Sequence, residues 1–203
     1  MACSNNLHNL ALALQNYHDV YGSFPPAYVA DATGKPMHSW RVLILPFIEQ
    51  KALYELYKFD EPWDGPNNSK LHGVSLPLYS CPAHTGKHPQ TETSYVAVVG
   101  PRTVWPDEKT TRMSDITDGT GNTLLIVEAH NAGIHWMEPR DLDYVQMPMA
   151  INPLRGSGIS SHHPTLAQAA FVDGSVRALS DNTPPATIRA VLTRNGREKV
   201  ELP

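Results

Sequence analysis

The stretch SNNLHNLALALQNYHDVYGSFPP, residues 4–26, opens the chain with the pattern of an amphipathic helix. Apolar side chains recur at helical spacing and share one face: Leu7, Leu10, Leu14, Tyr17 and Tyr21. Ser4 can cap the start of this helix, and Gly22 stands where a left-handed C-cap residue is usual. We therefore predict a helix over about 4–21 that packs its apolar face on a sheet.

A second pattern lies near the other end, where His163 is followed after nine residues by Asp173-Gly174. The strand-like runs 169–172 and 175–179 flank this dipeptide, which best fits a type I′ hairpin turn. Residues 94–99 and 123–128 are rich in β-branched side chains and predict two core strands. Because helices and strands do not alternate in βαβ units, the sheet is expected to be antiparallel.

The remaining segments are short. We expect a loop over 27–37, a helical stretch starting after Ser39 with a kink at Pro46, and turns over 57–72. Residues 74–79 predict a short edge strand, and a last helix is expected from Thr183 to near Gly196. The predicted fold is α+β, a single domain over 1–203: helix 1–22, helical and loop insertion 23–92, sheet 93–182, and C-terminal helix and tail 183–203.

Composition limits the class of protein. The chain has 203 residues, a formal net charge of -4 and a pI near 6.2. With no Lys/Arg cluster, these values argue against a nucleic-acid binder. Eighteen prolines beside a hydrophobic content of 41% indicate a loop-rich but folded domain.

Several motifs carry a resemblance to a known family. Asn5-Asn6-Leu7, the run 14–19, the run 21–26 and the His163 to Asp173-Gly174 signature resemble a large planctomycete family of unknown function, with a prepilin-like N-terminus. Further landmarks follow in order: Ser39-Trp40-Arg41-Val42, Leu45-Pro46, Glu49-Gln50, Cys81-Pro82, Ser94-Tyr95, Asp118-Gly119-Thr120-Gly121-Asn122-Thr123 and Trp136-Met137-Glu138-Pro139-Arg140-Asp141-Leu142. The match extends from Cys3 to about Leu192.

The resemblance implies a fold similar to type IV pilins and pseudopilins. It also implies a periplasmic or extracellular place in the cell envelope, and envelope or pilus-type assembly proteins as partners. Members normally begin with a basic stub, a prepilin-peptidase site and a long apolar helix half, whereas this chain opens at Met1-Ala2-Cys3. No run approaches the roughly 18 apolar residues that span a bilayer, and no signal peptide is present. Either the chain was trimmed or it is a truncated reading frame; we expect trimming, with membrane contact only through that missing helix.

The two cysteines are Cys3, at the start of the first helix, and Cys81, after a short apolar run. In an envelope protein, a minimal even count suggests a disulfide that ties helix to sheet. The alternative is two unrelated thiols.

A divalent metal site is a second hypothesis, since the chain holds ten histidines. The candidate ligands lie at strand ends and in nearby loops: Glu128, His130, His135, His162, His163 and Asp173. A zinc site needs three or four such ligands to converge, but no His-Glu-x-x-His or Cys/His spacing is present. His163 also has a structural interpretation, in which its imidazole orders the loop that enters the hairpin.

Calcium is a further possible ion, at the oxygen-rich loop that holds Asp115, Asp118 and Asn122. This loop lacks the ligand spacing of an EF-hand. The competing interpretation is that Asp118 and Asn122 form Asx-turns.

Three tryptophans lie in Pro-rich loops, namely Trp63, Trp105 and Trp136. An exposed indole there could stack on a glycan or another small-molecule ligand, or on a partner protein. The alternative is that each indole fills the space under a long connection.

Two functions remain open. The leading hypothesis is a pseudopilin-like envelope protein with a structural, assembly or surface-binding role and no reaction. The alternative is a metal-dependent hydrolase in which His163 and Glu128 are the catalytic candidates. The sequence contains no Gly-x-Ser-x-Gly elbow, which would indicate a serine hydrolase, and no Gly-rich phosphate loop, which would indicate phosphate binding.

Overall fold

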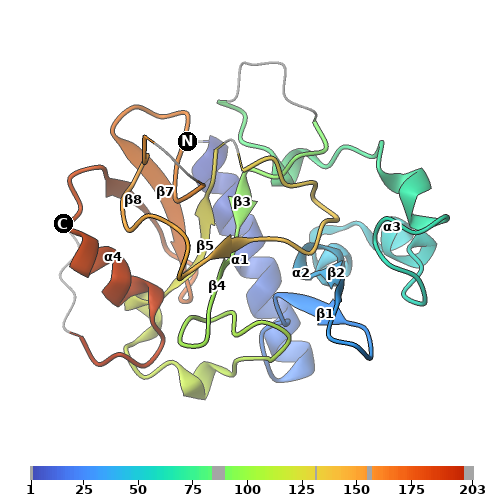
Figure 1. Cartoon of the computed structure of the whole chain (residues 1–203), viewed down its shortest axis with the longest axis horizontal. Coiled ribbons are helices and arrows are strands. Elements are labelled where there is room, and N and C mark those ends of the chain that lie inside the picture. The colour runs from blue at the N-terminus through green and yellow to red at the C-terminus, as the bar shows by residue number, and fades with distance from the viewer. Residues whose placement is uncertain (1, 84–89, 131, 155–156, 199–203) are drawn as a thin grey trace.

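The computed structural model describes residues 2–83, 90–130, 132–154 and 157–198. Its centre is a four-stranded antiparallel sheet in the order β3-β5-β7-β8. The strands span Tyr95–Val96 (β3), Leu124–Glu128 (β5), Leu166–Phe171 (β7) and Val176–Ser180 (β8). Helix α1 (Ala2–Tyr21) runs along the sheet, and the short helix α4 (Pro185–Leu192) lies at its side (Figure 1). The predicted α+β fold, with an N-terminal helix on an antiparallel sheet and a short C-terminal helix, is confirmed.

Helix α1 buries most of its predicted apolar face. Leu7, Leu10 and Leu14 are fully buried, whereas Tyr21 is 60% exposed, because the helix passes beyond the sheet at its last turn. Gly22 ends the helix with a left-handed φ of 77°, as predicted, and its N–H donates to the carbonyl of His18 at 2.7 Å. Ser4 lies inside the helix, so its assignment as the N-cap is wrong.

The sheet carries a hydrophobic core on each face, because side chains alternate along its strands. Ile126 and Ala170 belong to the core that α1 covers. Phe171 and Leu179 belong to the second core, which includes Ile188 and other residues of α4. Both faces of the sheet are therefore buried, and candidate sites lie at its edges and ends.

The hairpin of β7 and β8 forms at the predicted place but with a different turn. Gly174 has a φ of 84°, whereas Asp173 is not among the described residues with positive φ. A type I′ turn needs positive φ at both central positions, so that prediction is wrong. The N–H of Gly174 donates to Phe171 (2.9 Å), and that of Phe171 donates to Ser175 (2.8 Å). A left-handed glycine after a tight turn is typical of a three-residue loop.

The segment between α1 and the sheet is more regular than expected. Strands β1 (Tyr28–Ala30) and β2 (Pro36–Ser39) form a small hairpin where a loop was predicted. Ser39 caps α2 (Trp40–Leu43), and a 3₁₀ turn at Leu45–Ile48 separates it from α3 (Lys51–Leu56), so the break at Pro46 is confirmed. The predicted edge strand 74–79 is wrong, because a 3₁₀ helix spans Pro77–Tyr79 there.

Two other boundaries differ from the prediction. The expected strand 94–99 is divided, and β4 (Val98–Val99) leaves the main sheet to pair in parallel with β6 (Leu142–Asp143). Helix α4 ends at Leu192 and not near Gly196. The other 3₁₀ helices span Asn68–Leu71, Met113–Asp115 and Thr120–Asn122.

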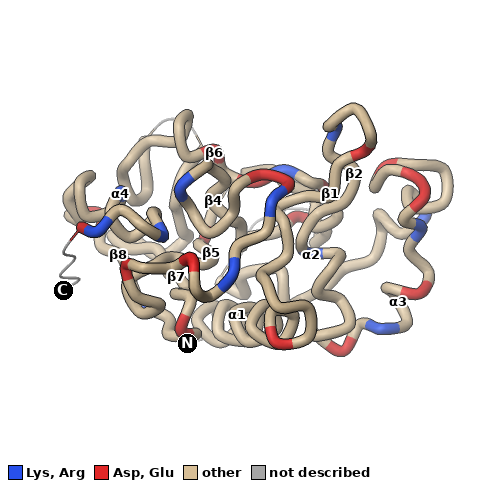
Figure 2. Tube along the Cα trace, turned by 90° about the horizontal axis from the view of Figure 1, so that it is seen from below, with Lys and Arg blue, Asp and Glu red and all other residues tan. Residues whose placement is uncertain are grey.

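Charge is spread over the loops. Figure 2 shows Lys and Arg interspersed with Asp and Glu, while α1 is nearly free of both. Asp19 is the one such residue in α1. Among the described helices, none is long and apolar enough to cross a membrane.

Candidate functional site

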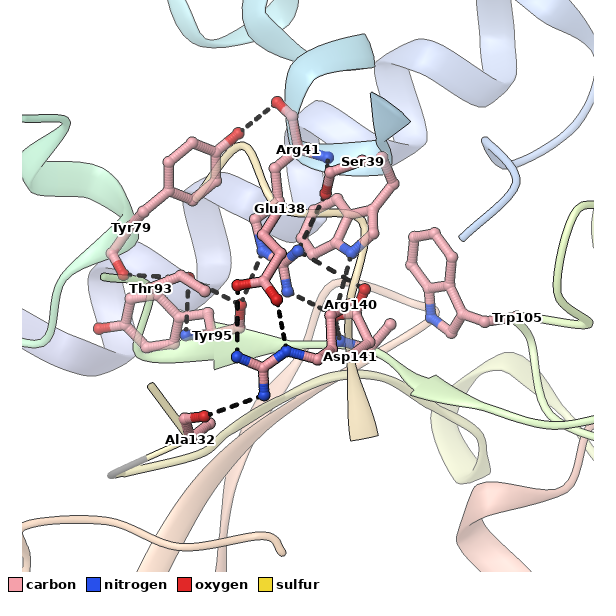
Figure 3. Close-up of polar contacts among 12 residues, drawn as sticks. Ser39, Arg41, Tyr79, Thr93, Tyr95, Trp105, Ala132, Glu138, Arg140 and Asp141 are labelled. Atoms are coloured by element: carbon pink, nitrogen blue, oxygen red, sulfur yellow. Dashed lines mark hydrogen bonds and ion pairs between the residues drawn. The ribbon is translucent and has the colours of Figure 1, made fainter. Parts of the chain in front are cut away.

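A buried ion pair joins two distant landmark segments. Arg41, in α2, contacts Asp141, which lies just before β6, and both side chains are almost inaccessible to solvent. The Asp141 carboxylate also accepts hydrogen bonds from the Ala97 N–H (2.8 Å) and the Trp40 indole (3.3 Å). Figure 3 shows Arg41 and Asp141 pointing toward each other. The pair is enclosed by protein donors.

The surroundings of Arg41 complete this network. Its guanidinium donates to Ser39 Oγ (2.9 Å) and to the Tyr95 carbonyl (3.3 Å), while the Tyr79 hydroxyl donates to the Arg41 carbonyl (2.7 Å). Burial raises the pKa of Asp141, and the Arg41 charge opposes that rise. Because every group faces protein, the network is suited to fixing α2 against β3 and β6.

A second cluster lies at the end of α1 where the chain starts. Cys3, in the first turn of α1, forms a disulfide with Cys81, which follows the 3₁₀ helix Pro77–Tyr79. Glu128 ends β5, and His163 lies in the loop before β7. The sulfur, carboxylate and imidazole ligand atoms of these four residues all lie within 4.8 Å of one another. The structure thus confirms the predicted disulfide and places two predicted metal candidates beside it.

Glu128 is the acid of this four-residue cluster and is buried, at 2% exposed. Its Oε2 accepts the Gln168 N–H at 2.8 Å, whereas its Oε1 is buried with no hydrogen-bond partner among the described residues. Burial raises the pKa of Glu128, and the Gln168 N–H, the Ser161 hydroxyl and His163 oppose that rise. One carboxylate oxygen is therefore poised for a further partner.

Two hollows adjoin the cluster. The first, lined by Cys81, Glu128 and His162 among others, has a volume of about 10 Å³, enough for about one water. The second is a surface hollow of about 480 Å³ that His163 lines together with residues 152–154. Glu128 lines the small hollow, and His163 lines the large one.

Of the other metal candidates, two lie at the small hollow and two lie away from it. His130 and His162 lie ring to ring, with centroids 3.4 Å apart, and both line the small hollow. His135 packs among Trp63 and His72, its Nε2 bonded to the His72 carbonyl at 3.1 Å. Asp173 lies beyond the far end of β7 and accepts the Ser175 N–H at 2.9 Å.

In the loop proposed for calcium, backbone donors occupy the carboxylates. Asp115 accepts the Arg112 N–H at 2.8 Å. Asp118 does not form the expected Asx-turn, because its two oxygens accept the N–H groups of Gly196 (2.6 Å) and Arg197 (2.7 Å). The Asn122 amide donates to the Asp118 carbonyl at 3.3 Å. These contacts fix the loop to the chain that follows α4.

The loop tryptophans separate into two kinds. Trp105 and Trp136 are each 1% exposed, and their indole N–H groups donate to the carbonyls of Leu125 (2.6 Å) and Val74 (2.9 Å). They fill the core under long connections, so neither is an exposed stacking surface. Trp63 is only partly buried and stacks on His72, with ring centroids 5.0 Å apart. Trp63 remains a candidate ligand contact.

The sequence did not reveal the Arg41–Asp141 pair or the approach of the disulfide to Glu128 and His163. The available signal was that Arg41 and Asp141 each lie in a landmark segment.

The fold and the two buried clusters define an α+β domain in which a disulfide ties the helix to its core. The chain belongs to the family described as "Protein of unknown function (DUF1559)", whose family model matches residues 1–105 and 84–186. No curated protein and no solved structure matches the chain.

Proposed function

We propose that this chain is a pseudopilin-like cell-envelope protein with a structural role in assembly. The observation that carries the proposal is the outer face of α1. Exposed side chains on this face fall at helical spacing: Asn5, Asn9, Leu12, Asn16 and Val20. None of these five is charged, and the exposed Asp19 beside them is the one Asp, Glu, Lys or Arg of α1, whereas surface helices usually expose several charged residues.

A face of this kind suits contact with another protein. The centres of protein interfaces are depleted in charged side chains. Leu12 is 47% and Val20 is 64% exposed, and Leu12 lies on the side of α1 opposite the buried Leu10 and Leu14. We infer that the outer face of α1 packs on a helix of another envelope assembly protein, a second copy of this chain included.

The disulfide supports an envelope location. Structural disulfides persist in the periplasm and outside the cell and are rare in the cytosol. The Cys3–Cys81 bond joins residues 78 apart in sequence, and both are buried in the core below α1. The helix that carries the proposed interface is thus covalently held in place.

In-cell photo-crosslinking tests this role. A photoreactive residue at Leu12 or Asn16 of the full-length protein should give adducts with a second copy or with another envelope assembly protein. The same residue at Val145, which is 82% exposed in a loop, is the control and should give none. Recovery of the protein in the cytosolic fraction, or equal adducts from all three positions, would overturn the proposal.

The hydrolase alternative has weaker geometric support. The structure does bring Glu128 close to His163. Yet the hollow beside Glu128 has room for about one water, while the larger hollow is lined by His163. A hydrolase must present its base and its metal to the same substrate. We therefore favour the structural role.

A further inference from the structure

We propose that Cys3, Cys81, Glu128 and His163 form a zinc site when the two cysteines are reduced, so that the disulfide and the metal exclude each other. The four donors are two sulfurs, one carboxylate oxygen and one imidazole nitrogen, all within 4.8 Å of one another. Zinc in structural sites takes four ligands of these types in a tetrahedron. The proposal extends beyond the envelope role and does not depend on it.

The distances suit this exchange. At a Zn–S length of roughly 2.3 Å, two thiolates on a tetrahedral zinc lie about 3.8 Å apart. The Cα atoms of Cys3 and Cys81 are 5.1 Å apart, so small side-chain rotations can separate the sulfurs to that distance. The backbone can stay in place because Cys3 is in α1 and the Cys81 N–H is held by Ser94 Oγ at 2.9 Å.

Glu128 supplies an independent indication of a cation. Its Oε1 is buried and has no hydrogen-bond partner within the described part of the chain, and an unpaired buried carboxylate oxygen is costly. Its Oε2 is held by the Gln168 N–H, the kind of outer contact that orients a metal ligand. The His163 N–H is held by Ser161 Oγ at 3.1 Å, which fixes the loop that carries the imidazole.

The chemistry balances with a dithiol reductant. Two electrons and two protons from the reductant break the Cys3–Cys81 bond and give two thiols, while the reductant closes its own disulfide. Zinc then forms two Zn–S bonds and displaces both thiol protons to solvent. Oxidation of the thiolates by a disulfide of higher potential would release the metal.

The test compares oxidised and reduced forms of tag-free protein. Native mass spectrometry with added zinc should show one zinc per reduced chain and none per oxidised chain. Cobalt(II) added to the reduced chain should give thiolate-to-metal charge-transfer bands and the visible bands of a tetrahedral site. Bound zinc should also protect both thiols from alkylation, a result that needs no variant.

Variants assign the ligands. Glu128→Gln keeps an oxygen that can accept the Gln168 N–H. Glu128→Gln and His163→Ala, each made as a single variant, should each weaken zinc binding by at least about tenfold. His8→Gln, at an exposed position of α1 outside the cluster, is the matched histidine control and should bind as the wild type does. Circular dichroism checks that each variant is folded. Failure of the reduced wild type to bind zinc, or full binding by both ligand variants, would overturn the proposal. Neither result bears on the crosslinking test of the envelope role.

Discussion

The side-chain amide of Gln15 in α1 donates a 2.8 Å hydrogen bond to the backbone carbonyl of Val172 in the hairpin loop. His8, two helical turns earlier, contacts the Gly174 carbonyl at 3.1 Å in the same loop. The opening helix and the closing Asp-Gly signature therefore contact each other directly. The hairpin loop owes its position to α1 as well as to its own turn residues.

The first prediction concerns Gly174, whose φ of 84° disfavours any side chain. A Cβ at this position would lie 3.3 Å from the Gln15 amide nitrogen. Gly174→Val should therefore lower the free energy of unfolding by about 2 kcal/mol, measured by urea denaturation. Gly73→Val is the control, because a Cβ at Gly73 meets nothing within 4 Å and Gly73 has no positive φ. Equal effects of the two changes would refute the role of the turn.

The second prediction tests the packing of α1. Leu14 is fully buried, so Leu14→Ala should cost about 2–5 kcal/mol of stability through lost burial and a cavity. Leu12→Ala on the outer face, where Leu12 is 47% exposed, should cost much less. Thermal and urea unfolding measure both. A Leu14→Ala change within error of zero would contradict the helix-on-sheet packing.

The third prediction addresses the buried Arg41–Asp141 pair. Removing one partner leaves the other charge buried, so Arg41→Met should cost about 3–5 kcal/mol. The double variant Arg41→Met/Asp141→Leu should lose less than the sum of the two single changes, since it leaves no buried charge. Arg140→Met breaks the Glu138 pair, where Arg140 is 50% exposed, and should cost at most about 1 kcal/mol. Strict additivity in the double variant would contradict this account.

The fourth prediction concerns pH. His38 is buried, with Nδ1 bonded to the Tyr57 hydroxyl (2.8 Å) and Nε2 to the Phe59 carbonyl (3.2 Å). Burial lowers the pKa of His38, and the Phe59 bond partly opposes that shift. The native state then binds fewer protons than the unfolded state below about pH 6.5, so stability falls as the pH drops through the window below that value.

Urea unfolding measured from about pH 7 to about pH 5 checks this sign. His38→Gln keeps polar atoms without a titrating ring, so the variant should lose less stability than the wild type over the same range. Burial also lowers the pKa of His135. The His38→Gln variant should therefore keep part of the dependence of its free energy of unfolding on pH. If the free energy of unfolding changed equally with pH in wild type and variant, the role given to His38 would be contradicted.

The sequence predicted those parts of the fold that depend on helical periodicity and on the backbone preferences of single Gly and Pro residues. The 3.6-residue period of α1, Gly22, Pro46 and the Asp-Gly turn each act through their own backbone, and each was placed correctly. Short strands such as β1 and β2 were missed because three or four residues do not establish a period of two.

The candidate site was less predictable because its parts come from distant segments. Arg41 and Asp141 are 100 residues apart, and no local pattern signals their pairing. The cysteine pair, Glu128 and His163 converge only after α1 has packed on the sheet. The sequence indicated the residue types at strand ends but not which of the histidines would reach Glu128.

The most direct test of the central claim, an envelope protein whose α1 is tied to the core by a disulfide, is the thiol state of the protein in its native cells. Cells are quenched in acid, unfolded with an alkylating reagent and no reductant, and digested for mass spectrometry. The account predicts that the Cys3 and Cys81 peptides are recovered joined to each other and unalkylated. Recovery of both peptides fully alkylated without prior reduction would contradict it.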